Sequence, residues 1–389
     1  MGKPRILIFR HELLPWSETF ILNQAESLQN YEPIYLGLRR VPGLQTDPER
    51  TLCIQDTSTS GWMRGQIFRA LCWTPSLIPQ LRSLGVRLIH AHFEGGGMVM
   101  SHAARVLGIP LLVTFHGIDV TKETHHQWPN PAIRQLWLRR RAALQRRGDV
   151  FLGVSSFIRS RALHLGYPEE RTRVHYIGVD VSKLSPNHNA ARDPVVLFAG
   201  RLVEKKGCRY MLEAMQVLRA TAPELQLIVV GDGPLRESLQ DEARLRGVNA
   251  RFLGQCTKSE VLEWMGRSRM LCAPFLPAAD GDTDGCPTVL LEAQATGLPV
   301  IAFDHGGSAE ALDNGSTGIL TPVGNAAALA DSILRLHSDD ALWKQLSISG
   351  RSFVEKQFDL RTQNTRLEEL YDQTIREKCL QAKSVRSSS

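Results

Sequence analysis

The stretch DGDTDGCPTVLLE, residues 280–292, has the residue types and part of the spacing of a metal-binding loop. Its three alternate aspartates and the glycine after them match the opening of an EF-hand calcium loop, which closes on a bidentate Glu at position 12. Position 12 here is Leu291, and the carboxylate of Glu292 would lie about 100° further round a helix. The segment before the loop contains two prolines and is expected to be a strand, not the required helix. The sequence therefore predicts no metal site in this loop.

The same stretch suits an anionic ligand better. Pro287 is expected at the first position of a helix, which leaves Asp284 in the loop before it and Glu292 about two turns inside. The free amides in the first turn of a helix bind anions. Two carboxylates and these amides would suit a diphosphate that carries sugar hydroxyls at both ends. The alternative is an acidic surface loop that caps the helix.

Two basic residues follow another expected strand in FAGRLVEKKG, residues 198–207. Arg201 and Lys206 can together hold a diphosphate and stabilise it as a leaving group, although an ordinary solvated basic turn would have the same sequence. In VVGDG, residues 229–233, a Gly-x-Gly turn precedes a helix. The sequence has no third glycine at Rossmann spacing, so a tight turn is favoured over dinucleotide binding.

The amino-terminal half offers candidate contacts for a second substrate. His116 follows an expected strand in TFHGID and is a candidate for substrate contact or proton handling, or else a structural histidine. Ser17 in LPWSETF is expected to be the N-cap of a helix, whose free amides could meet a phosphate or a hydroxyl. The glycines of AHFEGGG, residues 91–97, allow close approach of a ligand or form a flexible loop.

Positive charge is concentrated in the same half. Residues 1–190 hold 23 Lys and Arg against 14 Asp and Glu, a formal charge of +9, and the remaining residues carry −3. The segment IRQLWLRRRAALQRR, residues 133–147, is strongly basic, but Arg140 and Arg147 fall within its apolar face. A membrane-surface helix segregates charge better, so a solvated or cleft-facing helix is preferred and contact with an anionic membrane surface is the alternative. No motif supports a nucleic acid partner.

The elements that would position these residues alternate as in a wound sheet. Short apolar runs separated by helical patterns are typical of parallel sheets covered on both faces. Two sets of such units, divided by a non-periodic stretch at 176–193, predict an α/β protein with two doubly wound, Rossmann-like domains. Because ligands bind at the carboxyl ends of such strands, the active site is expected in a central cleft that both domains face. The expected strands are 5–10, 33–38, 87–93, 110–117, 150–155, 194–200, 225–233, 250–254, 270–275, 298–303 and 317–322.

Length and composition fit a two-domain soluble enzyme. The chain has 389 residues, of which 43% are hydrophobic and 22% charged, and no apolar run of the roughly 20 residues that a membrane span needs. The first residues lack the long apolar stretch of a signal peptide. The seven cysteines form no CxxC pair and are expected to be reduced thiols. The expected localisation is cytoplasmic, with peripheral contact at the inner face of the cytoplasmic membrane as an open alternative.

Taken in order, these motifs resemble the retaining glycosyltransferases of family 4, whose two-domain fold is called GT-B. The similarity covers nearly the whole chain and is most specific between residues 280 and 320, where DGDTDGCPTVLLEAQATGLPVIAF is followed by HGGSAEAL and NGSTGIL. Members that assemble bacterial exopolysaccharides such as colanic acid are particularly similar. The resemblance implies a metal-independent hexosyltransferase that moves a sugar from a UDP- or GDP-sugar donor to a carbohydrate or lipid-linked acceptor in polysaccharide biosynthesis.

The resemblance also implies the order of the domains. Residues 1–178 would form an N-terminal acceptor-binding domain, 179–193 a linker, and 194–360 a C-terminal domain that binds the nucleotide-sugar. A helix at 361–380 would pack back towards the N-terminal domain, and a disordered tail at 381–389 would follow it.

Site residues follow from the resemblance position by position. Arg201 and Lys206 would bind the donor diphosphate, Glu292 the ribose, and His116 would lie beside the reacting centre. Asp284 stands where the family has the first Glu of its Glu-x7-Glu pair, and its side chain reaches about 1.5 Å less. The implied catalytic residues are His116, Arg201, Lys206 and Asp284. The implied donor-binding residues are Gly200, Arg201, Lys206, Gly233, Leu253, Gly254, Asp284, Gly285, Thr288, Val289 and Glu292. The implied acceptor-binding residues are Ser17, Glu18, Thr19, Phe93, Gly95, Gly96 and Asp119.

Two other functions remain open on the sequence alone. A hydrolysing nucleotide-sugar epimerase shares the fold and would form its product without an acceptor. A catalytically weak protein that binds a sugar nucleotide is suggested by Asp284 in place of Glu. The run from 280 to 320 favours transfer over both.

Overall fold

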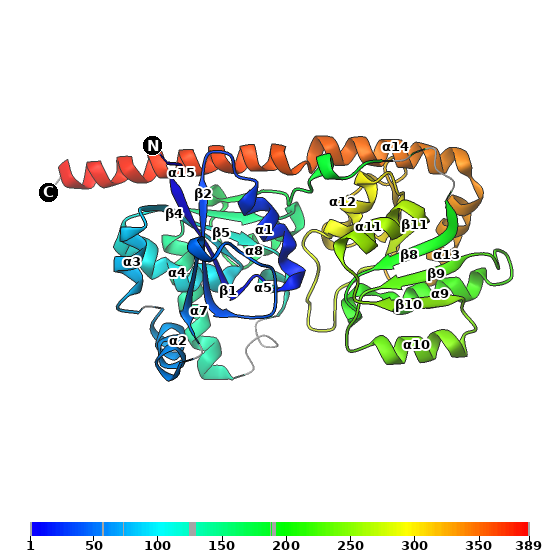
Figure 1. Ribbon diagram of the computed structural model, residues 1–389, viewed down its shortest axis with the longest axis horizontal. Helices are drawn as coiled ribbons and strands as arrows, with labels where there is room; N and C mark the ends of the chain where they lie inside the picture. The colour runs from blue at the N-terminus through cyan, green and yellow to red at the C-terminus, as the bar shows by residue number, and fades with distance from the viewer. Residues whose placement is uncertain are drawn as a thin grey trace. The chain divides into compact units, whose positions relative to one another are not determined.

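Contacts divide the computed structural model of the chain into unit 1, Met1–Gly178 with Leu360–Ser389, and unit 2, Val179–Asp359. The chain therefore passes from unit 1 to unit 2 once and returns once (Figure 1). The structure describes residues 2–56, 58–72, 74–123, 130–186, 188 and 192–387. Residues 187 and 189–191 of the predicted linker, and 388 and 389 of the predicted tail, lie outside the described residues.

Unit 1 is built on a seven-stranded parallel sheet in the order β3-β2-β1-β4-β5-β6-β7. The residues of β1 from Ile6 to Phe9 are all buried, because both faces of the sheet are covered. Phe9 is in register with Leu36 of β2 and Ala91 of β4. The strand order reverses between β1 and β4, where wound sheets leave room for ligands beyond the strand ends. The strands are β1 (Arg5–Leu13), β2 (Glu32–Arg40), β3 (Thr51–Gln55), β4 (Val86–His92), β5 (Leu111–Phe115), β6 (Val150–Gly153) and β7 (Thr172–Val174).

Helices connect these strands, and their ends carry recognisable caps. Asn130 caps α7, since its side-chain oxygen accepts hydrogen bonds from the amides of Ala132 and Ile133, and Pro131 occupies the first helical position. The helices and 3-10 turns are η1 (Trp16–Glu18), α1 (Thr19–Glu26), η2 (Pro48–Arg50), α2 (Thr59–Leu71), α3 (Leu77–Ser83), α4 (Glu94–Leu107), α5 (Ile118–Thr121), α7 (Pro131–Arg147), α8 (Ser156–His164), η3 (Glu169–Arg171) and α15 (Leu360–Ser387).

Unit 2 repeats the plan with a six-stranded parallel sheet in the order β10-β9-β8-β11-β12-β13. Its strand order reverses between β8 and β11. The strands are β8 (Asp193–Ala199), β9 (Gln226–Val230), β10 (Ala250–Gly254), β11 (Ser268–Ala273), β12 (Val300–Phe303) and β13 (Ile319–Thr321). The helices and 3-10 turns are η4 (Val181–Lys183), η5 (Glu204–Lys206), α9 (Cys208–Leu218), α10 (Arg236–Leu245), α11 (Lys258–Arg267), α12 (Thr288–Ala295), η6 (Gly306–Ser308), α13 (Ala326–Ser338) and α14 (Asp340–Gln357).

The predicted fold of two doubly wound α/β sheets is confirmed. Each strand expected from an apolar run is present, with ends that differ by at most three residues. The strands β3 and β7 were not predicted. Both are short and lie at the edges of the sheet, and their sequences TLCIQ and TRV mix polar and apolar residues. A continuous apolar run marks only the strands that are buried on both faces.

Two local predictions in unit 1 are wrong. Ser17 is not a helix N-cap, because it is exposed inside the turn η1 and α1 begins only after Glu18. The glycines of AHFEGGG do not form a loop but the first turn of α4. A Cβ on Gly97 would lie 2.5 Å from the side chain of Val113, so this glycine lets α4 pack closely on the sheet.

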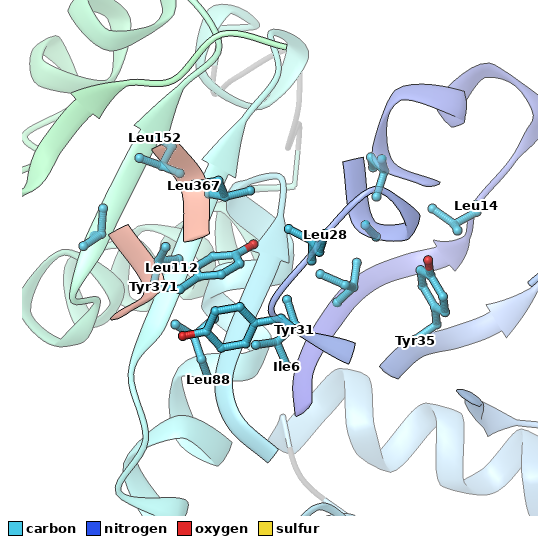
Figure 2. Close-up of a cluster of buried hydrophobic side chains, with 14 of the residues drawn as sticks. Ile6, Leu14, Leu28, Tyr31, Tyr35, Leu88, Leu112, Leu152, Leu367 and Tyr371 are labelled. Carbon is cyan, nitrogen blue, oxygen red and sulfur yellow. The ribbon is translucent and has the colours of Figure 1, made fainter. Parts of the chain in front are cut away.

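The last helix, α15, completes the core of unit 1. Figure 2 shows Leu367 and Tyr371 of α15 among Leu112, Leu152 and other buried side chains of the sheet. The cluster consists of Ile6, Ile8, Leu13, Leu14, Ile21, Ala25, Leu28, Tyr31, Tyr35, Leu88, Leu112, Val150, Leu152, Leu367 and Tyr371.

Hydrogen bonds fix the register of α15 on unit 1. The backbone amide and side-chain amide of Asn30 donate to Glu368 at 2.7 and 2.9 Å, and Tyr31 Oη donates to Asp372 at 2.6 Å. The helix continues to Ser387, so residues 381–387 differ from the predicted disordered tail. The segment contains no Gly or Pro that would end a helix.

A buried histidine links α15 to the sheet. His90 Nδ1 lies 2.6 Å from the hydroxyl of Tyr371, and its Nε2 lies 2.7 Å from the hydroxyl of Thr114. Burial, and then the charge of His175, lower the pKa of His90 to about 3. The folded protein therefore excludes a proton that the unfolded chain binds below pH 6.5.

Acidification is expected to destabilise the protein through His90. As the pH falls from about 6.5 to about 3, each pH unit lowers the free energy of unfolding by about 1.4 kcal/mol for a proton that only the unfolded chain binds. The variant His90→Gln keeps a polar amide at this site but has no group that takes up a proton in this pH range. Its urea midpoint should therefore fall less between pH 7.5 and 4.5 than that of the unmodified protein.

The control is His164→Gln, at an exposed histidine of α8. It should leave the pH dependence unchanged. Equal pH dependence in His90→Gln and the unmodified protein would show that His90 takes up its proton without unfolding.

Candidate active site

Ion pairs join the loops that follow β8 and β11, at the point of unit 2 where the strand order reverses. Lys205 Nζ lies 3.0 Å from Asp282 Oδ1 and 3.3 Å from Asp284 Oδ1. Lys206 Nζ lies 2.6 Å from Asp284 Oδ2. All four side chains are largely buried, where an unpaired charge is costly. Two of the alternate aspartates in DGDTDG therefore have lysines as their partners.

The charge state of Asp284 follows from these neighbours. Burial alone would raise the pKa of Asp284, but the positive charges of Lys206 and Lys205 outweigh it and lower the pKa below its ordinary value. The carboxylate is ionised at neutral pH. Lys206 Nζ also lies 3.9 Å from the centre of the Phe275 ring, a cation–π contact. The ammonium group of Lys206 is thus held by both a carboxylate and a ring.

Glycines let the loops at this edge approach one another closely. At three of them an added Cβ would strike the backbone of the neighbouring loop, so no other residue fits without a shift. A Cβ on Gly207 would lie 1.9 Å from the carbonyl oxygen of Pro274, and one on Gly231 would lie 2.0 Å from that of Gly200. A Cβ on Gly307 would lie 1.9 Å from the carbonyl oxygen of Gly285. The loops after β8, β9, β11 and β12 therefore converge.

The second predicted carboxylate lies on α12. This helix begins at Thr288, and Pro287 is its N-cap rather than its first residue. Glu292 is therefore little more than one turn inside the helix, not two. Glu292 Oε1 lies 3.2 Å from Lys258 Nζ at the start of α11. Each carboxylate of the predicted pair thus has a lysine as its counter-ion.

The other predicted donor-binding residues lie on the same loops. Arg201 follows β8, is exposed, and takes no part in the Lys–Asp cluster of the described loops. Gly254 closes β10 at a φ of 77°, and its carbonyl accepts a 2.8 Å hydrogen bond from Gly231 N. Gly200 and Gly233 follow β8 and β9, Leu253 lies in β10, Gly285 lies in the DGDTDG loop, and Thr288 and Val289 lie in the first turn of α12.

In unit 1, His116 lies beyond the end of β5 beside the reversal of strand order. Its Nε2 lies 3.0 Å from Nδ1 of His92. The rings of Phe93 and Phe20 pack against it with centroids 4.7 and 4.9 Å away. Burial, and then the charge of Arg10, lower the pKa of His116 well below its ordinary value, so the imidazole is neutral at pH 7.

One polar atom of His116 is left without a protein partner. Its Nδ1 is buried and forms no hydrogen bond with the residues that the structure describes. A buried polar atom without a partner is unusual and often marks a place where a ligand or water binds. His116 can therefore offer one ring nitrogen to a hydroxyl group.

Phe93, whose ring packs against His116, has a strained backbone conformation. Its φ is 65° with ψ 151°, a combination that non-glycine residues rarely adopt. The guanidinium of Arg10 lies 4.2 Å above the Phe93 ring. Arg10 also forms a bidentate pair with buried Glu18, at 2.7 to 3.0 Å. Glu18, predicted to bind the acceptor, is therefore occupied by Arg10.

The carboxylate of Asp119 is also engaged within the protein, by hydrogen bonds from backbone amides. Its carboxylate accepts hydrogen bonds from the amides of Glu94, His116 and Gly117 at 3.0 to 3.1 Å. Burial raises the pKa of Asp119 to about 6, although the hydrogen bonds from the amides of Gly117 and Glu94 lower it. Asp119 thus positions His116 and the start of α4 rather than pointing a free carboxylate outward.

The structure brings together Phe93, His116 and Asp119 and separately Lys206 and Asp284. Of the remaining acceptor-binding predictions, Ser17 is exposed in η1 and Thr19 begins α1. Gly95 and Gly96 lie in α4, where added Cβ atoms would lie 3.1 Å from Trp137 and 3.3 Å from Phe9.

Sequence reasoning missed several residues of these clusters. Lys205 stands beside Lys206 in VEKKG, and Asp282 stands two residues before Asp284 in DGDTDG. Because the two loops carry opposite charges, the sequence could have suggested that these residues also form an ion pair. Lys258 carried no such indication, because its partner Glu292 is distant in sequence. Arg10 stands eight residues before its partner Glu18, but no motif marked it. Glu94, in the glycine motif, is buried with Arg141 at 2.6 Å and Tyr167 at 2.7 Å.

The described residues contain neither a metal-binding cluster nor a helix that could span a membrane. In the part of the chain that the structure describes, no three His, Cys, Asp or Glu side chains are grouped to hold a metal ion. The seven cysteines are free thiols. None of the described helices combines the length and the apolar character needed to cross a membrane.

Comparison with known proteins divides the chain in the same way. The model "Glycosyltransferase Family 4" matches residues 18–183, and the model "Glycosyl transferases group 1" matches residues 193–339. The structure of Anabaena Alr3699/HepE in complex with UDP and glucose superimposes with a TM-score of 0.75 at 18% identity, and covers 95% of this chain and 100% of that one. At this identity the likeness shows the fold alone.

Curated relatives are similar over a shorter range. The amylovoran biosynthesis glycosyltransferase AmsK of Erwinia amylovora is 26% identical over 279 residues, which are 70% of this chain and 66% of the relative. The putative colanic acid biosynthesis glycosyltransferase WcaL of Escherichia coli K12 is 30% identical over 251 residues, 62% of this chain and 59% of the relative. The match thus spans less than two thirds of either relative's length. The two family models together match most of the chain and show that it belongs to the glycosyltransferases, with a family 4 model on its first half and a group 1 model on its second.

Proposed function

We propose that the protein is a retaining glycosyltransferase that moves a sugar from a UDP- or GDP-sugar to a carbohydrate or lipid-linked acceptor in polysaccharide biosynthesis. The observation that carries the proposal is the meeting of Lys206 and Asp284 at the switch point of unit 2. One relative is an amylovoran biosynthesis glycosyltransferase, another is named a putative colanic acid biosynthesis glycosyltransferase, and a structural neighbour holds UDP and glucose.

The lysines supply the electrostatic part of the reaction. When the donor binds, its diphosphate replaces Asp284 as the counter-ion of Lys206, and exposed Arg201 folds over the second phosphate. Positive charge beside a departing diphosphate stabilises it as a leaving group. These side chains take the part that a divalent ion plays elsewhere, so the reaction needs no metal.

The carboxylates and His116 orient the sugars. Asp284, released from Lys206, accepts hydrogen bonds from hydroxyls of the donor sugar, and Glu292 accepts them from the ribose. The neutral imidazole of His116 offers its unpartnered Nδ1 to a sugar hydroxyl near the reacting centre. The acceptor hydroxyl attacks the anomeric carbon from the face that the diphosphate leaves, which retains the configuration. The bond from this carbon to the diphosphate oxygen breaks as the new glycosidic bond forms, and the proton of the acceptor hydroxyl passes to the departing diphosphate.

Removing either cation should abolish transfer. In Lys206→Ala and in Arg201→Ala, the leaving diphosphate loses a charge, and kcat should fall about 100-fold or more. Arg209→Ala, at an exposed arginine of α9, is the matched control and should keep full activity. Transfer of a radiolabelled sugar to saccharide acceptors measures the effect, and circular dichroism confirms folding.

Full activity in both variants would remove the assigned roles. The same assay without an acceptor separates transfer from the alternative of a hydrolysing epimerase. Product formation that needs no acceptor, with changed stereochemistry of the sugar, would favour the epimerase.

Nucleotides of one base should stabilise the protein without a metal. A ligand present at 100 times its Kd adds about 2.7 kcal/mol to stability, which raises Tm by several degrees. We expect this shift with UDP or GDP and their sugar conjugates, unchanged in EDTA and lost in Lys206→Ala. Stabilisation by calcium alone would instead make the aspartates of DGDTDG metal ligands.

Substitutions of Asp284 distinguish an enzyme from a degraded sugar-nucleotide-binding protein. Asp284→Asn should lower kcat about tenfold or more, because a neutral amide cannot take over the charge of the carboxylate. Asp284→Glu should not raise kcat, because Asp284 already reaches both lysines. Higher turnover in Asp284→Glu with unchanged nucleotide binding would indicate an enzyme that has lost activity at this position.

A further inference from the structure

Two helices of unit 1 expose an unusually large amount of apolar side chain. In α2, Trp62 is 55% exposed, Met63 53% and Leu71 64%. In α7, Ile133 and Leu136 are each 46% exposed. Single exposed apolar residues are ordinary on protein surfaces, whereas a cluster indicates a surface that contacts something apolar.

The two helices are neighbours, which the sequence could not show. The guanidinium of Arg140 in α7 donates hydrogen bonds to the carbonyls of Arg69 at 3.2 Å and Ala70 at 2.6 Å, at the end of α2. Figure 1 shows α2 and α7 side by side at one edge of unit 1. The exposed apolar residues of α2 and α7 therefore lie on adjoining helices of unit 1.

The residues of these two helices carry charge of a single sign. Residues 59–71 and 131–147 contain eight arginines and no Asp or Glu. Three of the eight are engaged: Arg140 caps α2, Arg141 is buried with Glu94, and Arg64 pairs with Asp56 just before α2. The side chains of Arg69, Arg139, Arg146 and Arg147 are exposed.

We propose that the α2–α7 face, made by Trp62, Met63, Ile67, Leu71, Ile133 and Leu136 with the exposed arginines of the two helices, docks peripherally on an anionic lipid bilayer. Aromatic and aliphatic side chains enter the boundary between headgroups and acyl chains, while arginines bind the lipid phosphates. The face matches this partner in both chemistry and sign of charge.

Charge complementarity selects the bilayer over a second copy of this chain. Two such faces would bring exposed arginines of the same sign together, which opposes association. The inference is independent of the proposed reaction, because it concerns unit 1 residues to which no catalytic or substrate-binding role is assigned. Binding can therefore be measured without any activity assay.

Sedimentation with lipid vesicles tests the proposal on the full chain. Vesicles of phosphatidylglycerol and phosphatidylcholine in equal parts are compared with vesicles of phosphatidylcholine alone. The protein should sediment with the anionic vesicles at low salt and be released at about 0.5 M salt, where surface charges are screened. Equal binding to both kinds of vesicle, or binding to neither, would overturn the proposal.

Variants at exposed positions identify the surface. Trp62→Ser combined with Leu71→Ser should weaken binding to anionic vesicles about tenfold or more. Leu245→Ser is the matched control, because Leu245 is 89% exposed on α10 of unit 2. Thermal unfolding shows that each variant is folded. An equal loss in the control, or no loss in the double variant, contradicts the assignment.

The electrostatic contribution is tested separately. Arg69→Gln combined with Arg139→Gln should weaken binding about 30-fold at low salt, as expected for two cations near an anionic surface. Arg335→Gln with Arg361→Gln removes the same charge from exposed positions elsewhere and should have little effect. Concentration-dependent self-association that Trp62→Ser abolishes, without vesicle binding, would assign the face to a second copy and overturn the proposal.

Discussion

The balance of buried charge after β8 and β11 constrains the rest of unit 2. Two lysines and two aspartates lie in contact, largely removed from water, with Nζ–Oδ distances of 2.6 to 3.3 Å. Leaving one such charge without its partner costs about 3–5 kcal/mol, so the loops that carry them must stay close. That approach is possible only because Gly207 and Gly307 present no Cβ to the facing backbone. Electrostatics sets the loop geometry, and the geometry requires the glycines.

The same constraint accounts for Asp at position 284, where the resemblance to family 4 implies a Glu. Its two oxygens reach different lysines, Oδ1 to Lys205 and Oδ2 to Lys206. A Glu would need its backbone withdrawn by about one C–C bond to keep both contacts. The backbone is tied, because Gly307 N donates to the carbonyl of Asp284 at 3.1 Å. The shorter carboxylate and the second lysine therefore belong together.

The sequence allowed the fold to be predicted wherever burial leaves a local pattern. Apolar runs located the inner strands, but β3 and β7 at the sheet edge were missed because their residues mix polar and apolar types. The order of the strands, and with it the switch points, depends on long-range pairing that no local pattern contains. In α7 the helical wheel placed Arg140 and Arg147 on the apolar face, yet the buried arginine is Arg141, which Glu94 neutralises from 47 residues away.

Unit 1 and unit 2 satisfy the charges at their sheet edges in different ways, and this difference decides what each can bind. In unit 1, Glu18 is held by a bidentate guanidinium and Asp119 by three backbone amides, so these charges serve the fold. Beyond the strand ends of unit 1, the groups near Glu18 and Asp119 that remain for a ligand are neutral: the imidazole of His116 and the aromatic rings around it. In unit 2, the charge of Lys206 is balanced by one carboxylate, that of Asp284 on a facing loop, which an incoming anion can replace. A neutral saccharide suits the first arrangement, and a diphosphate suits the second.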